Sequence, residues 1–121
     1  MSVPEMKENA DGSKEWCLNG KLHRTDGPAV EWPHGTKEWW LNGKRHRTDG
    51  PAVEYSNGTK AWYLNGEHHR TDGPAIEWPD GTKAWYLNDK QVTWLEVYFF
   101  NMRAGDIQTA EQILAMPKRK G

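Results

Sequence analysis

The sequence predicts a mainly β protein, an antiparallel meander of stacked β-hairpins that form an open, twisted sheet, capped by two short C-terminal α-helices. One observation is the segment His-Arg-Thr-Asp-Gly-Pro, which begins at residues 23, 46 and 69 and so recurs every 23 residues. A second is that strand-like runs alternate with turn residues in every copy. A third is that this regularity stops near residue 89. The chain therefore divides into a flexible N-terminal lead-in or a ragged first strand (1–12), four repeats of which the last is truncated (13–89), and a C-terminal helical cap with a basic tail (90–121).

Each copy opens with a strand candidate, at residues 13–18, 36–41, 59–64 and 82–87. Side chains alternate along a strand, so Lys, Trp and Leu share one face, and Thr or Ser, Glu or Ala, and a further bulky residue share the other. Asn-Gly follows at residues 19–20, 42–43 and 65–66 and predicts a hairpin turn. Two or three polar residues then lead into His-Arg-Thr-Asp-Gly-Pro.

A second strand follows at residues 29–32, 52–55 and 75–78, and a Gly-containing turn closes each unit. This pattern predicts a continuous meander of about seven strands. In the fourth copy Asn88-Asp89 replaces Asn-Gly, and we expect the array to end there.

The cap begins at Thr93 and Glu96, whose spacing predicts a capping box. It should open a helix over residues 94–103, and a second helix should run from Asp106 or Thr109 to Pro117. The first helix is apolar on nearly all sides, which is unusual for a surface helix. A homodimer through this helix would hide the excess apolar surface.

The composition indicates a thin core and a near-neutral surface. Only 36% of the 121 residues are hydrophobic, and eight Trp, four Tyr and two Phe supply much of the apolar area, so we expect an aromatic core. The net charge of −1 argues against a general polyanion binder. No apolar run is long enough to span a membrane, which predicts a cytoplasmic protein. Cys17 stands where later copies have an aromatic residue, and we expect it to pack there.

The repeated polar residues are more consistent with structure than with catalysis. Equivalent residues should lie about 10 Å apart, which is too far for His23, His46 and His69 to share a metal ion. We expect each His to pack or hydrogen-bond within its own turn. The Asp of each Thr-Asp-Gly-Pro should form an Asx turn, and the Gly should give the backbone freedom. Arg24, Arg47 and Arg70 should pair locally with Asp or Glu, and the alternative is a column of Arg for an anionic ligand.

These motifs resemble the MORN repeat. The pattern Trp-Tyr-Leu-Asn-Gly-Lys-x-His-Arg-x-Asp-Gly-Pro-Ala is similar to a variant found in small proteins of tailed phages, and the resemblance covers residues 13–89. It implies a scaffold of stacked hairpins that contacts other proteins, without catalytic residues or cofactors. A phage origin implies the host cytoplasm as the location.

We therefore expect a non-catalytic protein-binding module that engages or inhibits a host protein, for example a defence protein. One alternative is nucleic-acid or nucleotide binding through His, Arg and aromatic columns, and a second is a structural or membrane-associated scaffold, as in other MORN proteins. The candidate binding surface comprises His23, Arg24, His46, Arg47, His69, Arg70, Trp40, Tyr63, Tyr86, Trp94, Tyr98, Phe99 and Phe100. We expect no metal or cofactor site.

Overall fold

The computed structural model describes residues 3–101, apart from the side chains of residues 99–101, and this part of the chain is mainly β. The strands are β1 (Glu5–Glu8), β2 (Lys14–Leu18), β3 (Lys21–Leu22), β4 (Val30–Glu31), β5 (Lys37–Glu38), β6 (Trp40–Leu41), β7 (Lys44–Arg45), β8 (Val53–Glu54), β9 (Lys60–Ala61), β10 (Tyr63–Leu64), β11 (Glu67–His68), β12 (Ile76–Glu77), β13 (Lys83–Leu87) and β14 (Lys90–Val92). They are followed by one described helix, α1 (Trp94–Asn101).

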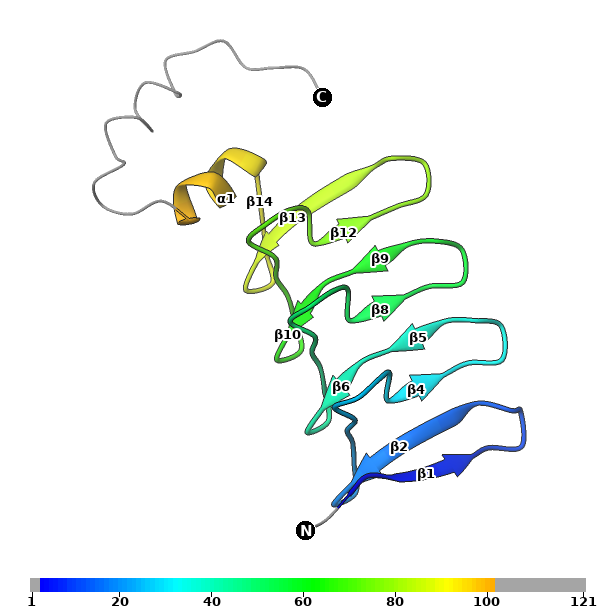
Figure 1. Cartoon of the computed structure of the whole chain (residues 1–121). Coiled ribbons are helices and arrows are strands. Elements are labelled where there is room, and N and C mark those ends of the chain that lie inside the picture. Colours follow the sequence, from blue (N-terminus) through cyan, green and yellow to red (C-terminus); the bar gives the residue numbers. More distant parts are fainter. Residues whose placement is uncertain (1–2, 102–121) are drawn as a thin grey trace, which may run out of the picture.

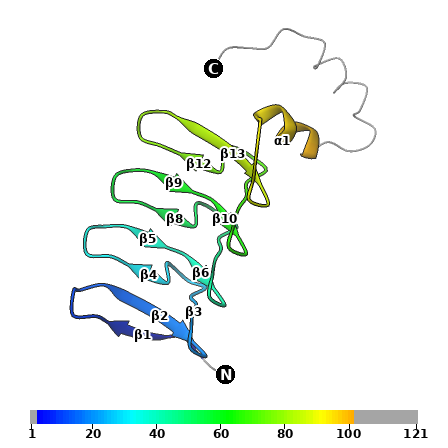
Figure 2. The same ribbon diagram turned by 180° about the vertical axis from the view of Figure 1, so that it is seen from behind.

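Ten of the strands form one antiparallel sheet in the order β1-β2-β4-β5-β8-β9-β12-β13-β14, with β3 paired to β2. The other four form the hairpins β6-β7 and β10-β11. Figure 1 shows the result as a ladder in which the turns that follow β1, β4, β8 and β12 project along one side. The view from behind shows α1 beside β13 at the C-terminal end of the same ladder (Figure 2). The predicted antiparallel meander is therefore present.

The expected number of about seven strands is wrong, because the residues after each Asn-Gly also pair. Asn42 and Gly43 have φ values of 51° and 79°, the double positive φ of a tight hairpin turn. The chain therefore reverses at once, and β7 pairs with β6. In the second and third copies the expected long first strand is also divided, into β5 and β6 and into β9 and β10.

The fourth turn does not end the pairing as predicted. Asn88 and Asp89 have φ values of 49° and 69°, so Asp89 adopts the conformation that Gly has in the other copies. Asp tolerates this left-handed region better than most residues do. The turn is retained, and β14 pairs with β13 in register Leu87↔Lys90.

Residues 5–8 form a first strand, one of the two alternatives that the sequence left open for this segment. β1 pairs with β2 over its whole length, and the Gly12 amide donates to the Asn9 carbonyl at 3.0 Å. The same turn bond joins Gly35 to Trp32, also at 3.0 Å. The segment thus supplies the closing hairpin that later copies form for themselves.

The core is thin as expected, but it is not aromatic. Ala29, Ala52, Val53 and Ala75 have exposed fractions of 0%, whereas Tyr63 is the one buried aromatic residue among the described side chains. Short side chains, mainly Ala and Val, therefore fill the centre of the ladder. The Trp side chains pack on the faces of the sheet instead.

Helix α1 begins with the predicted capping box. The Glu96 amide donates to Thr93 Oγ1 at 3.2 Å, and the Thr93 amide donates to Glu96 Oε1 at 3.3 Å. The second expected helix, 106–117, lies outside the described residues, as do residues 102 and 103 of the first. In the described part of the chain, no helix has the length and apolar character needed to cross a bilayer.

Candidate binding surfaces

The repeated Arg side chains are held by local contacts on one side of the sheet. The Arg47 guanidinium stacks on the Trp39 ring, with Cζ 3.8 Å from the ring centroid. Its Nε donates to Asp49 at 2.9 Å, and its Nη1 donates at 3.0 Å both to the Pro51 carbonyl and to Glu54. Arg24 and Arg70 make the equivalent contacts, the first with Trp16, Asp26, Pro28 and Glu31 and the second with Trp62, Asp72, Pro74 and Glu77. The predicted local ion pairs are confirmed.

We call this side, with Trp39, Trp62 and the three Arg loops, the arginine face. The Gly of each loop has a different role from the one predicted. A Cβ added at Gly50 would lie 2.9 Å from Arg47 Cζ, and one at Gly73 would lie 2.7 Å from Arg70 Cζ. A Cβ at either position would therefore press on the guanidinium, whereas neither Gly has the positive φ that would require glycine. The guanidinium lies between an indole ring and the loop backbone.

The Asp of each loop pairs with Arg, whereas Asx turns form in the closing turns. The hydrogen bond from Arg47 and its positive charge hold the pKa of Asp49 below its usual range. Arg24 and Arg70 lower the pKa values of Asp26 and Asp72 in the same way. The Asx turns form instead where the amides of Ser13, Thr59 and Thr82 donate to the side-chain oxygens of Asp11, Asn57 and Asp80.

The His side chains connect neighbouring copies, and the expectation that each bonds within its own turn is wrong. His46 Nδ1 accepts a bond from the Asn65 amide at 3.0 Å, across to the next Asn-Gly turn. His23 and His69 accept the equivalent bonds from the amides of Asn42 and Asn88. An accepting nitrogen carries no proton, so this bond fixes the tautomer of a neutral ring. The bonded rings brace successive copies of the ladder.

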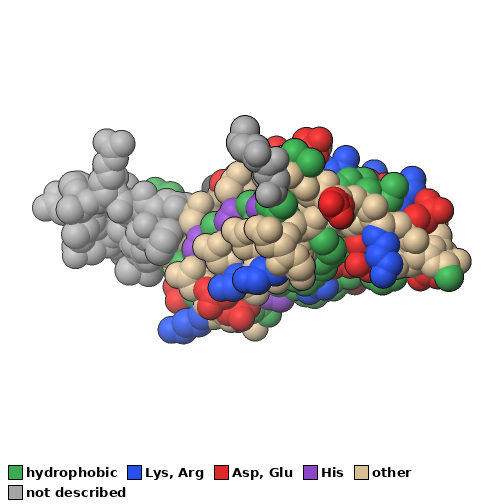
Figure 3. Space-filling model, turned by 90° about the horizontal axis from the view of Figure 1, so that it is seen from below, with side chains coloured by type: hydrophobic (Ala, Val, Ile, Leu, Met, Phe, Trp, Pro, Cys, Tyr) green, Lys and Arg blue, Asp and Glu red, His purple; other side chains and the backbone are tan. Residues whose placement is uncertain are grey.

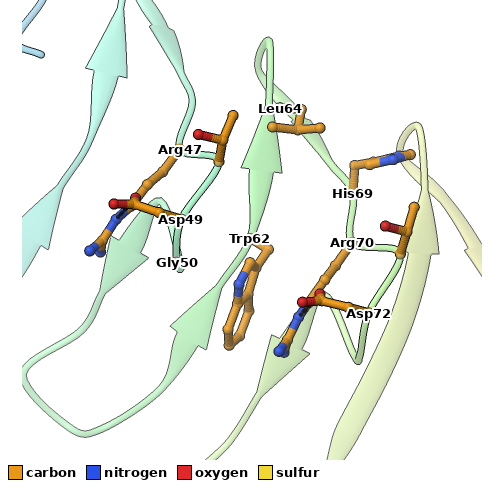
Figure 4. Close-up of a pocket in the computed structure, with 10 residues that line it drawn as sticks. Arg47, Asp49, Gly50, Trp62, Leu64, His69, Arg70 and Asp72 are labelled. Atoms are coloured by element: carbon orange, nitrogen blue, oxygen red, sulfur yellow. Dashed lines mark hydrogen bonds and ion pairs between the residues drawn. The ribbon is translucent and has the colours of Figure 1, made fainter.

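Two equivalent grooves lie between successive loops of the arginine face. In one of them, Trp62 and Leu64 lie between the Arg47-Asp49 loop and the Arg70-Asp72 loop (Figure 4). Its volume is about 570 Å³, and the groove one copy earlier, over Trp39 and Leu41, measures about 640 Å³. Both grooves carry exposed Asp beside their paired Arg. Acidic and basic side chains are also interspersed on the surface seen in Figure 3.

The opposite side, which we call the aromatic face, bears Trp40, Tyr63 and Tyr86. In the second copy it carries a polar network around Glu38, whose exposed fraction is 8%. The Glu38 carboxylate accepts bonds from Trp32 Nε1 at 2.6 Å and from Trp40 Nε1 at 3.1 Å, and it pairs with Arg45 at 3.2 Å. The two indole N–H groups and the guanidinium thereby compensate the buried charge.

The third copy differs at the same place, because Ala61 stands where the second has Glu38. A hollow of about 260 Å³ lies over Ala61 and Ile76, between Tyr55 and Trp78. Tyr55 and Trp78 are 39% and 38% exposed. Neither residue is among the candidates that the sequence indicated, although the change from Thr-Lys-Glu-Trp to Thr-Lys-Ala-Trp marks the position.

The remaining candidate residues differ in how far they are exposed. Trp94 and Tyr98 of α1 are 47% and 40% exposed, whereas Val97 is buried. Phe99 and Phe100 belong to α1, but their side chains lie outside the described set. The His68 ring lies between the rings of Tyr63 and Tyr86, tilted by 35° to the first and by 33° to the second.

Between residues 3 and 101, no three His, Cys, Asp or Glu side chains are grouped as a metal site would require. Cys17 is a half-buried free thiol on β2, in register with Leu22. Comparisons with protein-family models, with curated proteins and with solved structures found no match for this chain.

Proposed function

We propose that the chain is a non-catalytic protein-binding module. The observation that carries this proposal is the set of exposed aromatic side chains in the C-terminal half of the ladder: Tyr55, Trp78, Trp94 and Tyr98. Exposed aromatic side chains on a rigid scaffold are typical anchors of protein interfaces, because they bury large areas and lose little conformational entropy. The charged residues of the arginine face, by contrast, are already engaged with one another.

The MORN-like pattern supports the same proposal. A stack of similar hairpins presents an extended surface, which repeat proteins use to contact partners. The similarity to tailed-phage proteins favours a host protein as the partner, with inhibition of that protein in the host cytoplasm as the outcome.

The test is capture of a partner from host lysate by the immobilised protein. We expect one protein at stoichiometric levels with the wild type, and its loss with Trp78→Ser. Met6→Ser is the matched control, because Met6 is an exposed apolar side chain at the other end of the ladder, with an exposed fraction of 50%. Failure to capture any partner stoichiometrically, or equal capture by all three proteins, contradicts the proposal.

Nucleic-acid binding is the weaker alternative. The exposed Lys37, Lys60 and Lys83 favour it, but Asp49 and Asp72 side chains are 83% exposed beside the Arg residues and oppose a phosphate backbone. Binding of single-stranded RNA or DNA at low salt, weakening steeply as salt is added, would favour this alternative over a protein partner.

A homodimer through α1 is a further option for the exposed Trp94 and Tyr98. Sedimentation at two protein concentrations tests it, and a monomer at both concentrations excludes it.

A further inference from the structure

The hollow over Ala61 is the equivalent of the space that the Glu38 side chain fills one copy earlier. The strand pairing around the two positions is the same. Glu38 lies between Val30 and Val53 in register, and Ala61 lies between Val53 and Ile76. Since the backbone is matched, the difference between a filled and an open site comes from the side chains alone.

Around Glu38 the protein shows which groups hold a carboxylate at this position. Two indole N–H groups donate to it, and Arg45 supplies a positive charge. Charge-assisted bonds of this kind are stronger than neutral ones. Glu38 therefore serves as an internal example of a ligand for this site.

The open site keeps a hydrogen-bonding group at each of the three corresponding places. Counting 23 residues onward, Tyr55 stands for Trp32, Tyr63 for Trp40 and His68 for Arg45. All three line the hollow. Burial raises the pKa of Tyr63, so its hydroxyl keeps its proton and remains a donor at neutral pH.

His68 supplies the third group. Its Nδ1 lies 3.3 Å from Asp89 Oδ1 and its ring stacks on Tyr63, with 4.1 Å between ring centroids. Within residues 3–101, no bond to Nε2 is seen, so this nitrogen is the one left for a ligand. In the second copy the Arg45 guanidinium occupies the corresponding position.

We propose that the hollow binds the carboxylate of a Glu side chain presented by a protein partner. The exposed rings of Tyr55 and Trp78 form walls for the methylene groups of that side chain, and Ala61 and Ile76 form the floor. The proposal rests on the proposed protein-binding function and specifies the chemistry that the partner must present.

The test is an NMR titration of the full chain with Nα-acetyl-glutamate amide, followed through the Ala61 methyl and the Trp78 indole N–H. We expect saturable shifts with a dissociation constant on the order of millimolar, and about tenfold weaker binding of Nα-acetyl-glutamine amide, which has the same shape without the charge. Equal binding of the two probes, better binding of Nα-acetyl-leucine amide, or no shift with any probe overturns the proposal. Shifts of the Ala61 methyl on dilution of the protein alone would also overturn it, by assigning the hollow to a second copy of this chain.

Substitution gives an independent test. Ala61→Glu supplies the carboxylate from inside the protein, as in the second copy, and should abolish probe binding. Lys60→Gln is the matched control, because it makes the charge of the same strand more negative by one, as Ala61→Glu does, but on the exposed opposite face, and it should leave the dissociation constant within about twofold of the wild type. Tyr55→Phe removes one donor without a change of shape and should weaken binding severalfold even where Ala61→Glu perturbs folding. Wild-type affinity in Ala61→Glu and Tyr55→Phe overturns the proposal.

The two proposals fail in different ways. Probe binding without a host partner supports the carboxylate site and contradicts the proposed function. Capture of a host partner that Ala61→Glu leaves unchanged supports the proposed function and contradicts the carboxylate site.

Discussion

The arginine face and the aromatic face belong to the same repeated unit, but they differ in how far successive copies agree. On the arginine face the contacts of Arg47 recur around Arg24 and Arg70 with distances that differ by a few tenths of an ångström. On the aromatic face, the Glu38 network of one copy is replaced by the hollow over Ala61 in the next. Contacts that recur unchanged are those that stabilise every copy of the repeated unit. Positions that change while the strand register stays the same are free to bind something else.

The two faces should differ most in how much a substitution lowers the free energy of unfolding. Arg47→Ala removes the stack on Trp39 and the bond to the Pro51 carbonyl, and we expect it to lower the free energy of unfolding by about 2 kcal/mol. Trp78→Ser on the aromatic face should cost only about half as much, because Trp78 is 38% exposed and its loss leaves no charged group unpaired. Urea unfolding measures both. Equal losses in the two variants would remove the distinction between the faces.

The next effect concerns the Gly of the loop. Gly50→Ala places a methyl group against the Arg47 guanidinium and should cost about 1 kcal/mol by displacing it. If the clash is the cause, the cost should largely disappear in a protein that already carries Arg47→Ala, and a double-mutant cycle measures this coupling. Additive costs would show that Gly50 is needed for its backbone conformation, as the sequence suggested.

The Gly residues of the Arg loops also show which features of the structure can be predicted from the sequence. The period of 23 residues, the Asn-Gly turns and the capping box were predicted because each depends on residues that are neighbours in the chain. The role of Gly50 was missed because it depends on where a flexible Arg side chain folds back.

Two other features of the structure were not predicted from the sequence for the same reason. The bond between His46 and the Asn65 amide was missed because it joins residues 19 positions apart, and the distance depends on how the copies stack. The hollow was missed because it is visible only when Ala61 is compared with Glu38 in three dimensions. The secondary-structure elements could be predicted from the sequence, whereas the side-chain packing between copies could be seen only in the structure.

A smaller effect is expected for the His that braces the copies. His46→Ala leaves the Asn65 amide without its acceptor, and because water reaches this exposed turn the cost should be about 0.5 to 1 kcal/mol. Hydrogen exchange at the Asn65 amide should accelerate in this variant more than exchange at the Ala52 amide, which bonds within the sheet. His34→Ala is the control, because His34 is exposed in a closing turn and should leave both rates unchanged. Unchanged exchange at Asn65 in His46→Ala would contradict the bracing role.

The smallest effect is the acid dependence of the Arg-Asp pairs, which tests whether they belong to the fold. The pKa of Asp49 is lowered in the folded state by Arg47, so its contribution to stability is complete above the pKa of an unfolded Asp, about 3.9, and is lost as the pH falls through the lower folded value. Asp49→Asn should therefore be less stable than the wild type at pH 7, and the difference should shrink below about pH 4, when the wild-type carboxylate takes up a proton. Urea midpoints measured between pH 7 and pH 2 follow both proteins, and binding to any captured partner at pH 7 should be retained because Asp49 lies on the arginine face. A variant that keeps its midpoint at pH 7 and loses binding would move the functional site from the aromatic face to the Arg-Asp loops.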